Sequence, residues 1–303
     1  MKRQHIIILI ALSLALAGLL AYQQKKPSDK SETAISGFAN SVEEKKLSVT
    51  IDAQKFLVPE RFDSAWSAPP QTTACKKYRA AITNHHALAS DLIADLIREI
   101  ARCRPEIKTM IILSPDHYSA GSGPITIGHT NYQIAGEIVK IDTEATDRLK
   151  RAIPSAGESE MLFEHEHGIG ALVPFIHRIF PDVTIVPIAV KASMGTTERE
   201  RLTVWLTSES ARGVFILVSS DMSHYLDGAT ATKNDERTKR ALADSDKQFF
   251  ASAKDSFTDS GPAISITMKS LGEEHWHLLN QSISSHYAGS NAFTTTYITG
   301  LWD

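Results

Sequence analysis

The chain has 303 residues, of which 42% are hydrophobic and 22% charged, so it is long enough to bury a large core and has ordinary globular composition. Its net charge is -3, and no stretch interleaves basic and aromatic residues, which excludes nucleic acid as an expected partner. The two cysteines, Cys75 and Cys103, lack metal-finger spacing. They could pair in an oxidising compartment, or Cys103 could be a small buried residue at the end of a helix.

The N-terminal segment differs from the rest of the chain. Lys2 and Arg3 precede an uncharged apolar run from Ile6 to Tyr22, a form typical of a secretory signal or a signal-anchor. Cleavage after Ala17 would leave apolar residues behind, which favours an uncleaved anchor. We therefore expect residues 1–26 to contact the membrane and to place the remainder in a bacterial cell envelope. The protein would be anchored in the inner membrane with its remainder facing the periplasm or exterior, or it would be secreted if the signal is cleaved.

Residues 27–75 are expected to form a polar tether that passes into an extended, proline-containing segment lying on the domain. Regular structure then begins, so residues 76–303 are expected to form one α/β domain. A strand at 80–83, a helix at 87–102 with helical spacing of its apolar residues and a strand at 109–113 indicate a βαβ start. Parallel pairing of these two strands is expected.

The alternation of strands and helices continues to the C-terminus. A short hairpin is expected within residues 124–142, with strands at 183–190 and 214–218. Helices are expected at 143–151, 168–180, 197–208, 233–253 and 263–271, and closing strands at 282–287 and 292–300. The predicted class is α/β, a single domain with a central mixed, mostly parallel sheet flanked by helices.

Histidines follow three of the predicted strands. Asn84-His85-His86 comes after the first strand, Asp116-His117 after the second, and His224 after a later one. Ligands of open α/β sheets bind outside the carboxyl ends of the strands, and imidazole is a common metal ligand. Adjacent side chains usually point in different directions, so only one of His85 and His86 is expected to face a pocket. Each of these histidines could instead be an ordinary surface or capping residue.

Glu164-His165-Glu166-His167 is the densest group of titratable residues in the chain. It precedes a helix, so either glutamate could simply stabilise the helix N-terminus. In a functional site, His165 or His167 would orient a substrate or act in acid/base chemistry, and the two histidines could also bind a metal if they lay on one strand face. The spacing is not that of the zinc-protease H-E-x-x-H motif.

The loop Ser219-Ser220-Asp221-Met222-Ser223-His224 also ends a predicted strand. Ser220 or Ser223 with His224 and Asp221 could form a nucleophilic triad. Triads are recognised by geometry, however, and the chain has no G-x-S-x-G elbow.

The motifs, their order and their spacing resemble the Memo family, which includes the AmmeMemoRadiSam system protein B and has the fold of the class III extradiol dioxygenases. The resemblance runs from about Ala80 to the C-terminus and identifies 76–303 as a Memo-like domain. The matching stretches are Asn84-His85-His86-Ala87, Leu113-Ser114-Pro115-Asp116-His117, Glu166-His167-Gly168-Ile169 and Ser219-Ser220-Asp221-Met222-Ser223-His224. The last is the most specific.

This resemblance implies that His85 and His117 are metal ligands and that His224 is an acid/base group. Many members take their third ligand from a cysteine in a Thr-x-Cys-Gly motif, whose position is held here by Ser260 in Thr258-Asp259-Ser260-Gly261. A neutral hydroxyl is a poor ligand for iron, copper or zinc, and Asp259 could supply a carboxylate in its place.

Three hypotheses about function follow. The first is a metal-dependent redox or oxygenase-type enzyme acting on an unidentified small molecule, because two histidines and one carboxylate suit non-haem Fe(II), although Cu or Zn would also fit. Its expected metal ligands are His85, His117, Asp259 and Ser260, and its expected catalytic residues are His224, His167 and Asp221. The second is a non-catalytic module with a degenerate metal site that binds a small molecule or a protein. The third is a Ser/His hydrolase.

Overall fold

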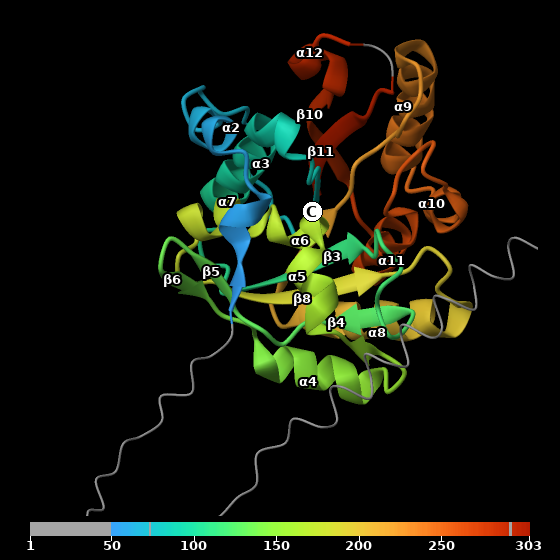
Figure 1. Cartoon of the computed structure of the whole chain (residues 1–303). Coiled ribbons are helices and arrows are strands. Elements are labelled where there is room, and N and C mark those ends of the chain that lie inside the picture. Colours follow the sequence, from blue (N-terminus) through green and yellow to red (C-terminus); the bar gives the residue numbers. More distant parts are fainter. Residues whose placement is uncertain (1–49, 73, 291–292) are drawn as a thin grey trace, which may run out of the picture. The chain divides into compact units, whose positions relative to one another are not determined.

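Two β-sheets organise the part of the chain that the computed structural model describes, which is residues 50–72, 74–290 and 293–303 (Figure 1). These residues belong to one compact unit. The larger sheet has eight strands, in the order β10 (Trp276–Ile283), β11 (Thr296–Trp302), β2 (Ala80–Thr83), β9 (Phe215–Ser219), β3 (Thr109–Pro115), β8 (Thr184–Val190), β4 (Ile125–Ile127) and β7 (Gly157–Glu158). The smaller sheet consists of β1 (Ile51–Asp52), β5 (Tyr132–Ile134) and β6 (Glu137–Val139).

The centre of the larger sheet is parallel. It consists of β2, β9, β3 and β8, each of which pairs in parallel with the next. On the two sides of this group, β11 pairs with β2 and β4 pairs with β8, both antiparallel. The sheet is therefore mixed and mostly parallel, as predicted. The expected direct pairing of β2 with β3 is wrong, because β9 lies between them. The three strands still run in the same direction, so the loops that follow them emerge at one edge of the sheet.

Helices cover both faces of this sheet. Along β3, Met110 and Ile112 belong to one apolar core, and Ile111 and Leu113 belong to a second core on the opposite face. α3 and α7 pack on the first face, and α4, α8 and α11 pack on the second (Figure 1). Double coverage explains why the central strands are continuous apolar runs rather than alternating patterns.

The helices were for the most part predicted in the correct places. In chain order they are η1 (Ala53–Phe56), α2 (Pro59–Ser64), η2 (Ala87–Ala89), α3 (Ser90–Cys103), α4 (Thr143–Ala152), α5 (Glu160–His165), α6 (His167–Gly170), α7 (Val173–Ile179), α8 (Thr196–Ala211), α9 (Gly228–Ala243), α10 (Lys247–Ser252), α11 (Gly261–Leu271) and α12 (Ser284–Ala288). The single helix expected at 168–180 is two helices, and the single helix expected at 233–253 is also two.

The hairpin expected within residues 124–142 is present, but it is formed by different strands from those predicted. β4 does not enter it but pairs with β8 in the larger sheet, and the hairpin consists of β5 and β6. Its turn is Ala135-Gly136, where both residues have positive φ, 49° and 92°. A two-residue turn with this backbone matches the twist of the strands that it connects, so the pairing is set locally.

Two further expectations about secondary structure are wrong. Ser284–Ala288 is the helix α12 rather than part of a closing strand. Pro59–Ser64 is the helix α2 rather than an extended segment, with proline at its first position, where the missing N–H has no cost. The α2 segment does lie on the domain, since Phe62 contacts Phe175 of α7 with ring centroids 4.8 Å apart.

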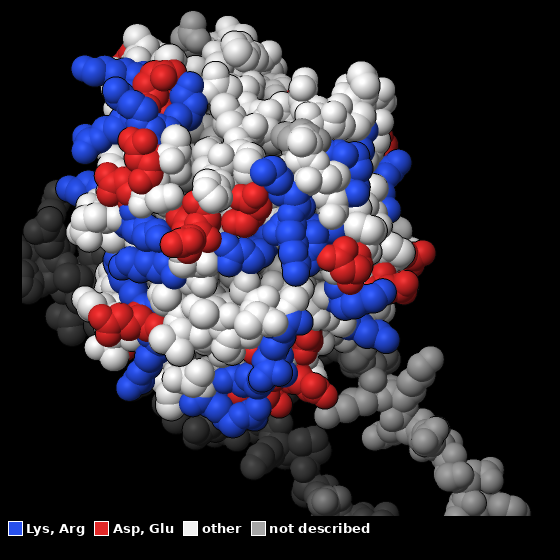
Figure 2. Space-filling model, turned by 180° about the vertical axis from the view of Figure 1, so that it is seen from behind, with Lys and Arg blue, Asp and Glu red and all other residues white. Residues whose placement is uncertain are grey.

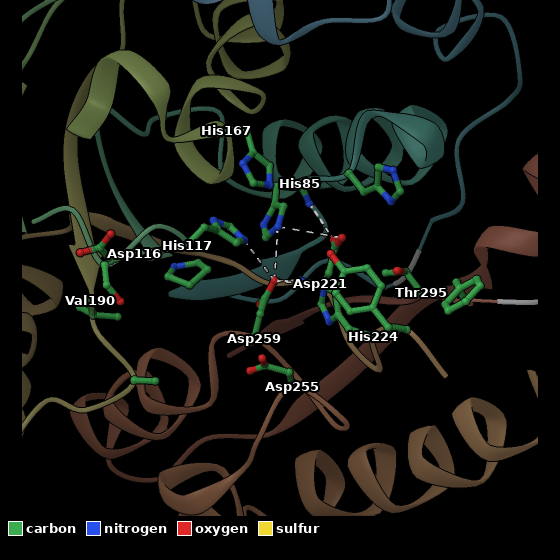
Figure 3. Close-up of a pocket in the computed structure, with 16 residues that line it drawn as sticks. His85, Asp116, His117, His167, Val190, Asp221, His224, Asp255, Asp259 and Thr295 are labelled. Carbon is green, nitrogen blue, oxygen red and sulfur yellow. Dashed lines mark hydrogen bonds and ion pairs between the residues drawn. The ribbon is translucent and has the colours of Figure 1, made fainter. Parts of the chain in front are cut away.

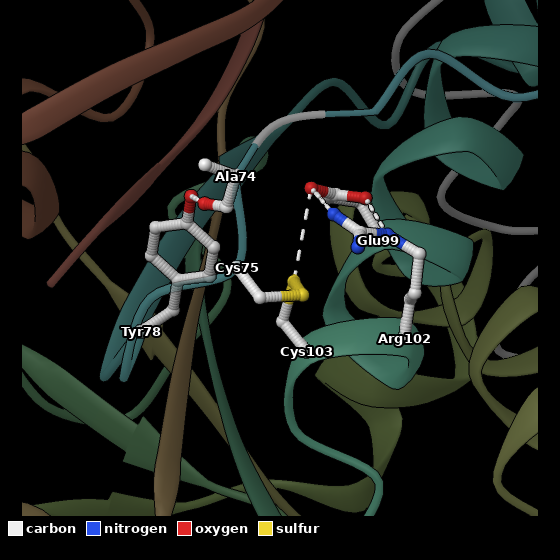
Figure 4. Close-up of a disulfide and its surroundings, with 6 residues drawn as sticks. All are labelled: Ala74, Cys75, Tyr78, Glu99, Arg102 and Cys103. Atoms are coloured by element: carbon white, nitrogen blue, oxygen red, sulfur yellow. Dashed lines mark hydrogen bonds and ion pairs between the residues drawn. A yellow bond between two sulfur atoms is a disulfide. The ribbon is translucent and has the colours of Figure 1, made fainter.

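The two cysteines form a disulfide, the pairing that the sequence left open (Figure 4). Cys75 lies ahead of β2 and Cys103 ends α3, and their Cα atoms are 5.1 Å apart. The bond closes a loop with a sequence separation of 28. Chain-entropy arguments give such a bond a stabilisation of about 3–4 kcal/mol, so it fastens the segment that leads into the sheet.

The apolar run from Ile6 to Tyr22 and most of the expected tether lie outside the described residues. Within the described ranges, no helix has the length and apolar character that a bilayer-crossing segment needs. Figure 2 shows the face opposite that of Figure 1, on which basic and acidic side chains are intermixed. Among the described residues visible there, this face presents no continuous basic surface of the kind that nucleic acid requires.

Candidate metal centre and pocket

A pocket of about 590 Å³ opens at the carboxyl ends of the parallel strands (Figure 3). Its lining includes histidines and carboxylates from several separate loops. They are His85, His86, His117, His167, His224, Asp116, Asp221, Asp255 and Asp259. The pocket therefore contains all of the predicted catalytic residues and three of the four predicted metal ligands.

His85 follows β2 and is buried, with 2% of its surface exposed. Its Nδ1 lies 2.8 Å from Ser219 Oγ, and that hydroxyl donates its own proton to the Gly168 carbonyl. The hydroxyl oxygen must therefore accept from His85 Nδ1–H, which makes Nε2 the nitrogen that can bind a metal. The same histidine is also held through its backbone N–H, which donates to Asp221 Oδ1 at 3.1 Å.

His117 follows β3 and is oriented by Glu166. Its Nδ1 lies 2.6 Å from Glu166 Oε1, and its backbone N–H donates to Oε2 at 3.1 Å. A carboxylate can only accept, so Nδ1 carries a proton and Nε2 is the nitrogen that can present a lone pair to a metal. Glu166 is fully buried and also accepts the Gly168 N–H at the start of α6. The sequence predicted only that Glu166 could stabilise the N-terminus of the helix, and not that it would hold His117.

Gly168 allows these groups to approach one another. A β-carbon at this position would lie 2.2 Å from Ser114 Oγ and 3.3 Å from His117 Cε1. A side chain there would require the Ser114 hydroxyl to rotate away and would press on Glu166 and the His117 ring.

His167 lies beside this pair of histidines. Its ring stacks on that of His117 with centroids 4.1 Å apart, and its centroid is 5.1 Å from that of His85. One nitrogen from each of the three rings can be chosen so that all lie within 4.8 Å of one another, a spacing at which they could hold a metal ion. The sequence predicted an acid/base role for His167, or metal binding together with His165, and did not predict its place beside His85 and His117.

Asp259 is directed at the same point (Figure 3). Its Oδ2 lies 3.3 Å from His85 Nε2, 3.6 Å from His117 Nε2 and 3.6 Å from His224 Nε2. Two ligands that are each bound at about 2.1 Å and subtend about 90–109° at a metal are about 3.0–3.4 Å apart. The observed separations are close to this range, so the residues present fit a small metal cation.

The protonation of the metal-free site follows from the same contacts. Burial alone would lower the pKa of His85, but Asp221 and Asp259 outweigh it and the pKa is raised. Burial is likewise outweighed at His117, where Asp259 and Glu166 raise the pKa to about 10. Burial would raise the pKa of Asp259, but His85 and His117 hold it far below its usual range. Without a metal, the rings of His85 and His117 therefore hold protons that face the Asp259 carboxylate.

The pKa of His167 is lowered, whereas the pKa values of His85 and His117 are raised. Burial, together with the nearby charges of His85 and His117, lowers its pKa to about 4. It is therefore neutral at physiological pH, which is the form of imidazole that can bind a metal.

Ser260 is placed differently from Asp259. Its hydroxyl donates to the Ser219 carbonyl at 2.8 Å, and it is not among the residues that line the pocket. Of the two residues that the sequence offered as a third ligand, the structure directs Asp259 toward the histidines.

Asp221 and His224 also line the pocket. Asp221 Oδ2 lies 3.9 Å from His85 Nε2, and only 3% of the residue is exposed. His224 Nδ1 is buried without a hydrogen-bond partner among the described residues, and its Nε2 faces Asp259. His224 is therefore able to exchange a proton at Nε2 inside the pocket.

The serines of this loop do not form a nucleophilic pair with His224. Ser220 Oγ bonds Thr258 Oγ1 at 2.6 Å, and Ser223 Oγ lies 3.2 Å from Asp235 Oδ1. Both serines are fully buried, and neither lines the pocket. Among the described residues, the arrangement that the hydrolase hypothesis requires is not assembled.

The expectation that only one of His85 and His86 faces the pocket is wrong, because both line it. His86 Nδ1 lies 2.8 Å from the hydroxyl of Tyr297, a residue of β11 that was not among the predicted site residues. Partial burial of the ring lowers the pKa of His86. No local pattern could have shown this contact, because it depends on β11 pairing with β2.

The fold and the site together define an α/β protein whose histidine-rich pocket lies where the parallel strands of a mixed sheet end. A family model described as "Memo-like protein" matches residues 66–301, and the chain belongs to this family. The predicted α/β fold, with a central mixed, mostly parallel sheet flanked by helices, is confirmed.

Curated relatives agree with this assignment. A MEMO1 family protein of Pyrobaculum arsenaticum is 27% identical over 201 residues, which cover 64% of this chain and 72% of the relative. One of Caldivirga maquilingensis is 27% identical over 152 residues, and this match spans 50% of the chain and only 54% of the relative. Among solved structures, the uncharacterized protein JW3007 of Escherichia coli has a TM-score of 0.51 at 13% identity, covering 72% of this chain and 98% of that one. This last similarity concerns the fold alone.

Proposed function

We propose that the pocket binds one transition-metal ion through His85, His117 and Asp259, with His167 in reach as a further nitrogen donor. The observation that carries the proposal is the convergence of the His85 and His117 Nε2 atoms on the Asp259 carboxylate, with each ring held through Nδ1 so that Nε2 is turned to the same point. In the metal-free protein protons bind at this point, and a metal cation that displaced them would be held by both Nε2 lone pairs and the carboxylate oxygen at once. Two histidines and a carboxylate suit Fe(II), and imidazole also suits copper and zinc.

We further infer that the site carries out oxidoreductase chemistry on a small molecule. A bound iron or copper ion would supply electron transfer to or from that molecule. The chain supplies the rest: Glu166 and Ser219 fix the ring orientations of His117 and His85, and His224 exchanges a proton at Nε2. Asp221 keeps the His85 loop in place through its backbone contact. Similarity of fold to a structure at 13% identity does not identify the substrate.

Metal analysis of the purified chain tests the first part of the proposal. Wild-type protein reconstituted with Fe(II), Cu(II) or Zn(II) is expected to retain stoichiometric metal after desalting. His117→Ala and Asp259→Asn are each expected to lower the affinity by about 100-fold or more, since each removes a ligand. His165→Ala is the matched control, because this exposed histidine lies outside the pocket. Folded wild-type protein that retains no metal would refute the proposal.

A non-catalytic binding module is the second candidate. It is favoured by Ser260, which stands where the family resemblance implies a cysteine ligand and whose hydroxyl donates to the Ser219 carbonyl rather than lining the pocket. A folded preparation that excludes metal but still binds a small molecule in the pocket would support this alternative.

We also propose that residues 1–26 direct export, that 27–75 connect this segment to the domain, and that 76–303 form the Memo-like domain outside the cytoplasm. The Cys75–Cys103 disulfide supports this assignment, because such bonds persist mainly in oxidising compartments. Thiol alkylation in intact cells is expected to leave both cysteines unlabelled until a reductant is added. Full labelling without reductant would contradict the proposal.

A further inference from the structure

His86 is a residue of the pocket to which the metal site assigns no role. It follows His85 directly, lines the pocket and is exposed there. The loop that carries His86 is held by the buried side-chain amide of Asn84, which donates to the carbonyls of His86 and Ala89 at 3.3 and 3.1 Å. The imidazole therefore has a defined place on the wall rather than a freely moving one.

The buried phenol of Tyr297 determines which ring nitrogen of His86 carries the proton. Tyr297 is fully buried, and His86 Nδ1 is the one partner that its hydroxyl has among the described residues. If Nδ1–H donated to the phenol oxygen, the phenolic proton would remain buried without an acceptor, which is unfavourable. The phenol therefore donates to Nδ1, and the proton of the neutral imidazole resides on Nε2.

His86 consequently differs from its neighbour His85 in what it offers to a ligand. Hydrogen bonding through Nδ1 leaves His85 with an Nε2 lone pair, suited to a cation. Hydrogen bonding through Nδ1 leaves His86 with an Nε2–H, suited to an acceptor. Nε2 of His86 has no hydrogen-bond partner among the described residues and is not enclosed, so the donor is available to a molecule in the pocket.

From this geometry we infer that His86, set by Tyr297, is a substrate-positioning residue that binds an anionic oxygen, such as one of a carboxylate. The inference rests on the proposed function in so far as the metal ion would lie next to the same ligand. A metal cation and an N–H donor on adjacent walls select an oxygen-bearing anion over a cationic or purely apolar molecule.

Formate is a suitable probe, since it is the smallest carboxylate and contributes no other contacts. ¹⁵N-labelled full-length chain is titrated with formate by NMR in metal-free and zinc-loaded forms. The His86 Nε2–H signal is expected to be present before formate is added and to shift as formate binds. His86→Ala is expected to weaken formate binding about 10-fold in both forms, as loss of a hydrogen bond to a charged group would do.

Three variants separate this role from a structural one. His86→Gln retains an N–H donor and is expected to recover part of the affinity. Tyr297→Phe keeps the ring but frees the tautomer, so the signal should redistribute between Nδ1 and Nε2 and the affinity should fall about 2- to 5-fold. His165→Ala should have no effect. All variants should bind zinc as wild type does.

The outcomes distinguish this inference from the metal site. If wild-type chain fails to bind zinc, the proposed function fails, and the metal-free titration still decides the role of His86. If formate binds equally to wild type and His86→Ala, if formate binds neither form, or if the His86 proton is found on Nδ1, the inference is wrong.

Discussion

Metal binding at this site should release protons, because His117 is protonated in the metal-free protein at neutral pH. Its pKa of about 10 is raised by Glu166 and Asp259 against the effect of burial. At about pH 7.5, displacement of this proton accounts for about one proton per metal, whereas a histidine of ordinary pKa would release about 0.1. The competition weakens binding at that pH by about 3 kcal/mol, since each pKa unit corresponds to about 1.4 kcal/mol.

Isothermal titration calorimetry with Zn(II) in buffers of different ionisation enthalpy measures the number of protons released. The expected value for wild type is one or more, and the affinity should rise about tenfold per pH unit between about pH 7 and pH 9 for each proton displaced. Glu166→Gln removes the carboxylate from Nδ1, which should lower the pKa of His117 and reduce the release at the same pH. Tight zinc binding with almost no proton release, and with an affinity independent of pH, would refute this account of the site.

Three other predictions concern stability and ligand identity. In chelated protein the raised pKa of His117 stabilises the fold fully below about pH 6.5, and this contribution is lost as the pH rises toward about 10. The free energy of unfolding measured in urea should therefore fall over this pH range, and it should fall less in Glu166→Gln. A free energy of unfolding that does not change with pH would contradict this prediction. Reduction of Cys75–Cys103 should lower the free energy of unfolding by about 3–4 kcal/mol, and a change below about 1 kcal/mol would show that the loop is held by other contacts. Ser260→Cys should change zinc affinity less than about threefold because its side chain points to the Ser219 carbonyl, whereas a large gain in affinity would show that the thiol reaches the metal.

The strands and helices were predictable from the sequence wherever the pattern reflects local geometry or burial on both faces. β2 and β3 appear as apolar runs because helices cover both sides of the sheet, and α3 keeps helical spacing along its apolar face. α12 was missed, because a five-residue helix offers too short a pattern to distinguish from a strand. The insertion of β9 between β2 and β3 was also missed, because strand order is decided by contacts between residues far apart in the chain.

The sequence by itself determined that histidines follow the strands of an α/β sheet, and it identified His85, His117, His224 and Asp259 as site residues. Parallel strands carry the loops at their carboxyl ends to one edge whatever their order, so the grouping of the histidines did not need coordinates, whereas Asp259 follows no strand and was suggested only by the family resemblance. Only the tertiary structure decided that His167 joins His85 and His117, that Ser260 turns away and that Tyr297 sets His86. These facts depend on side-chain directions at contacts that join distant segments, and no local pattern encodes them.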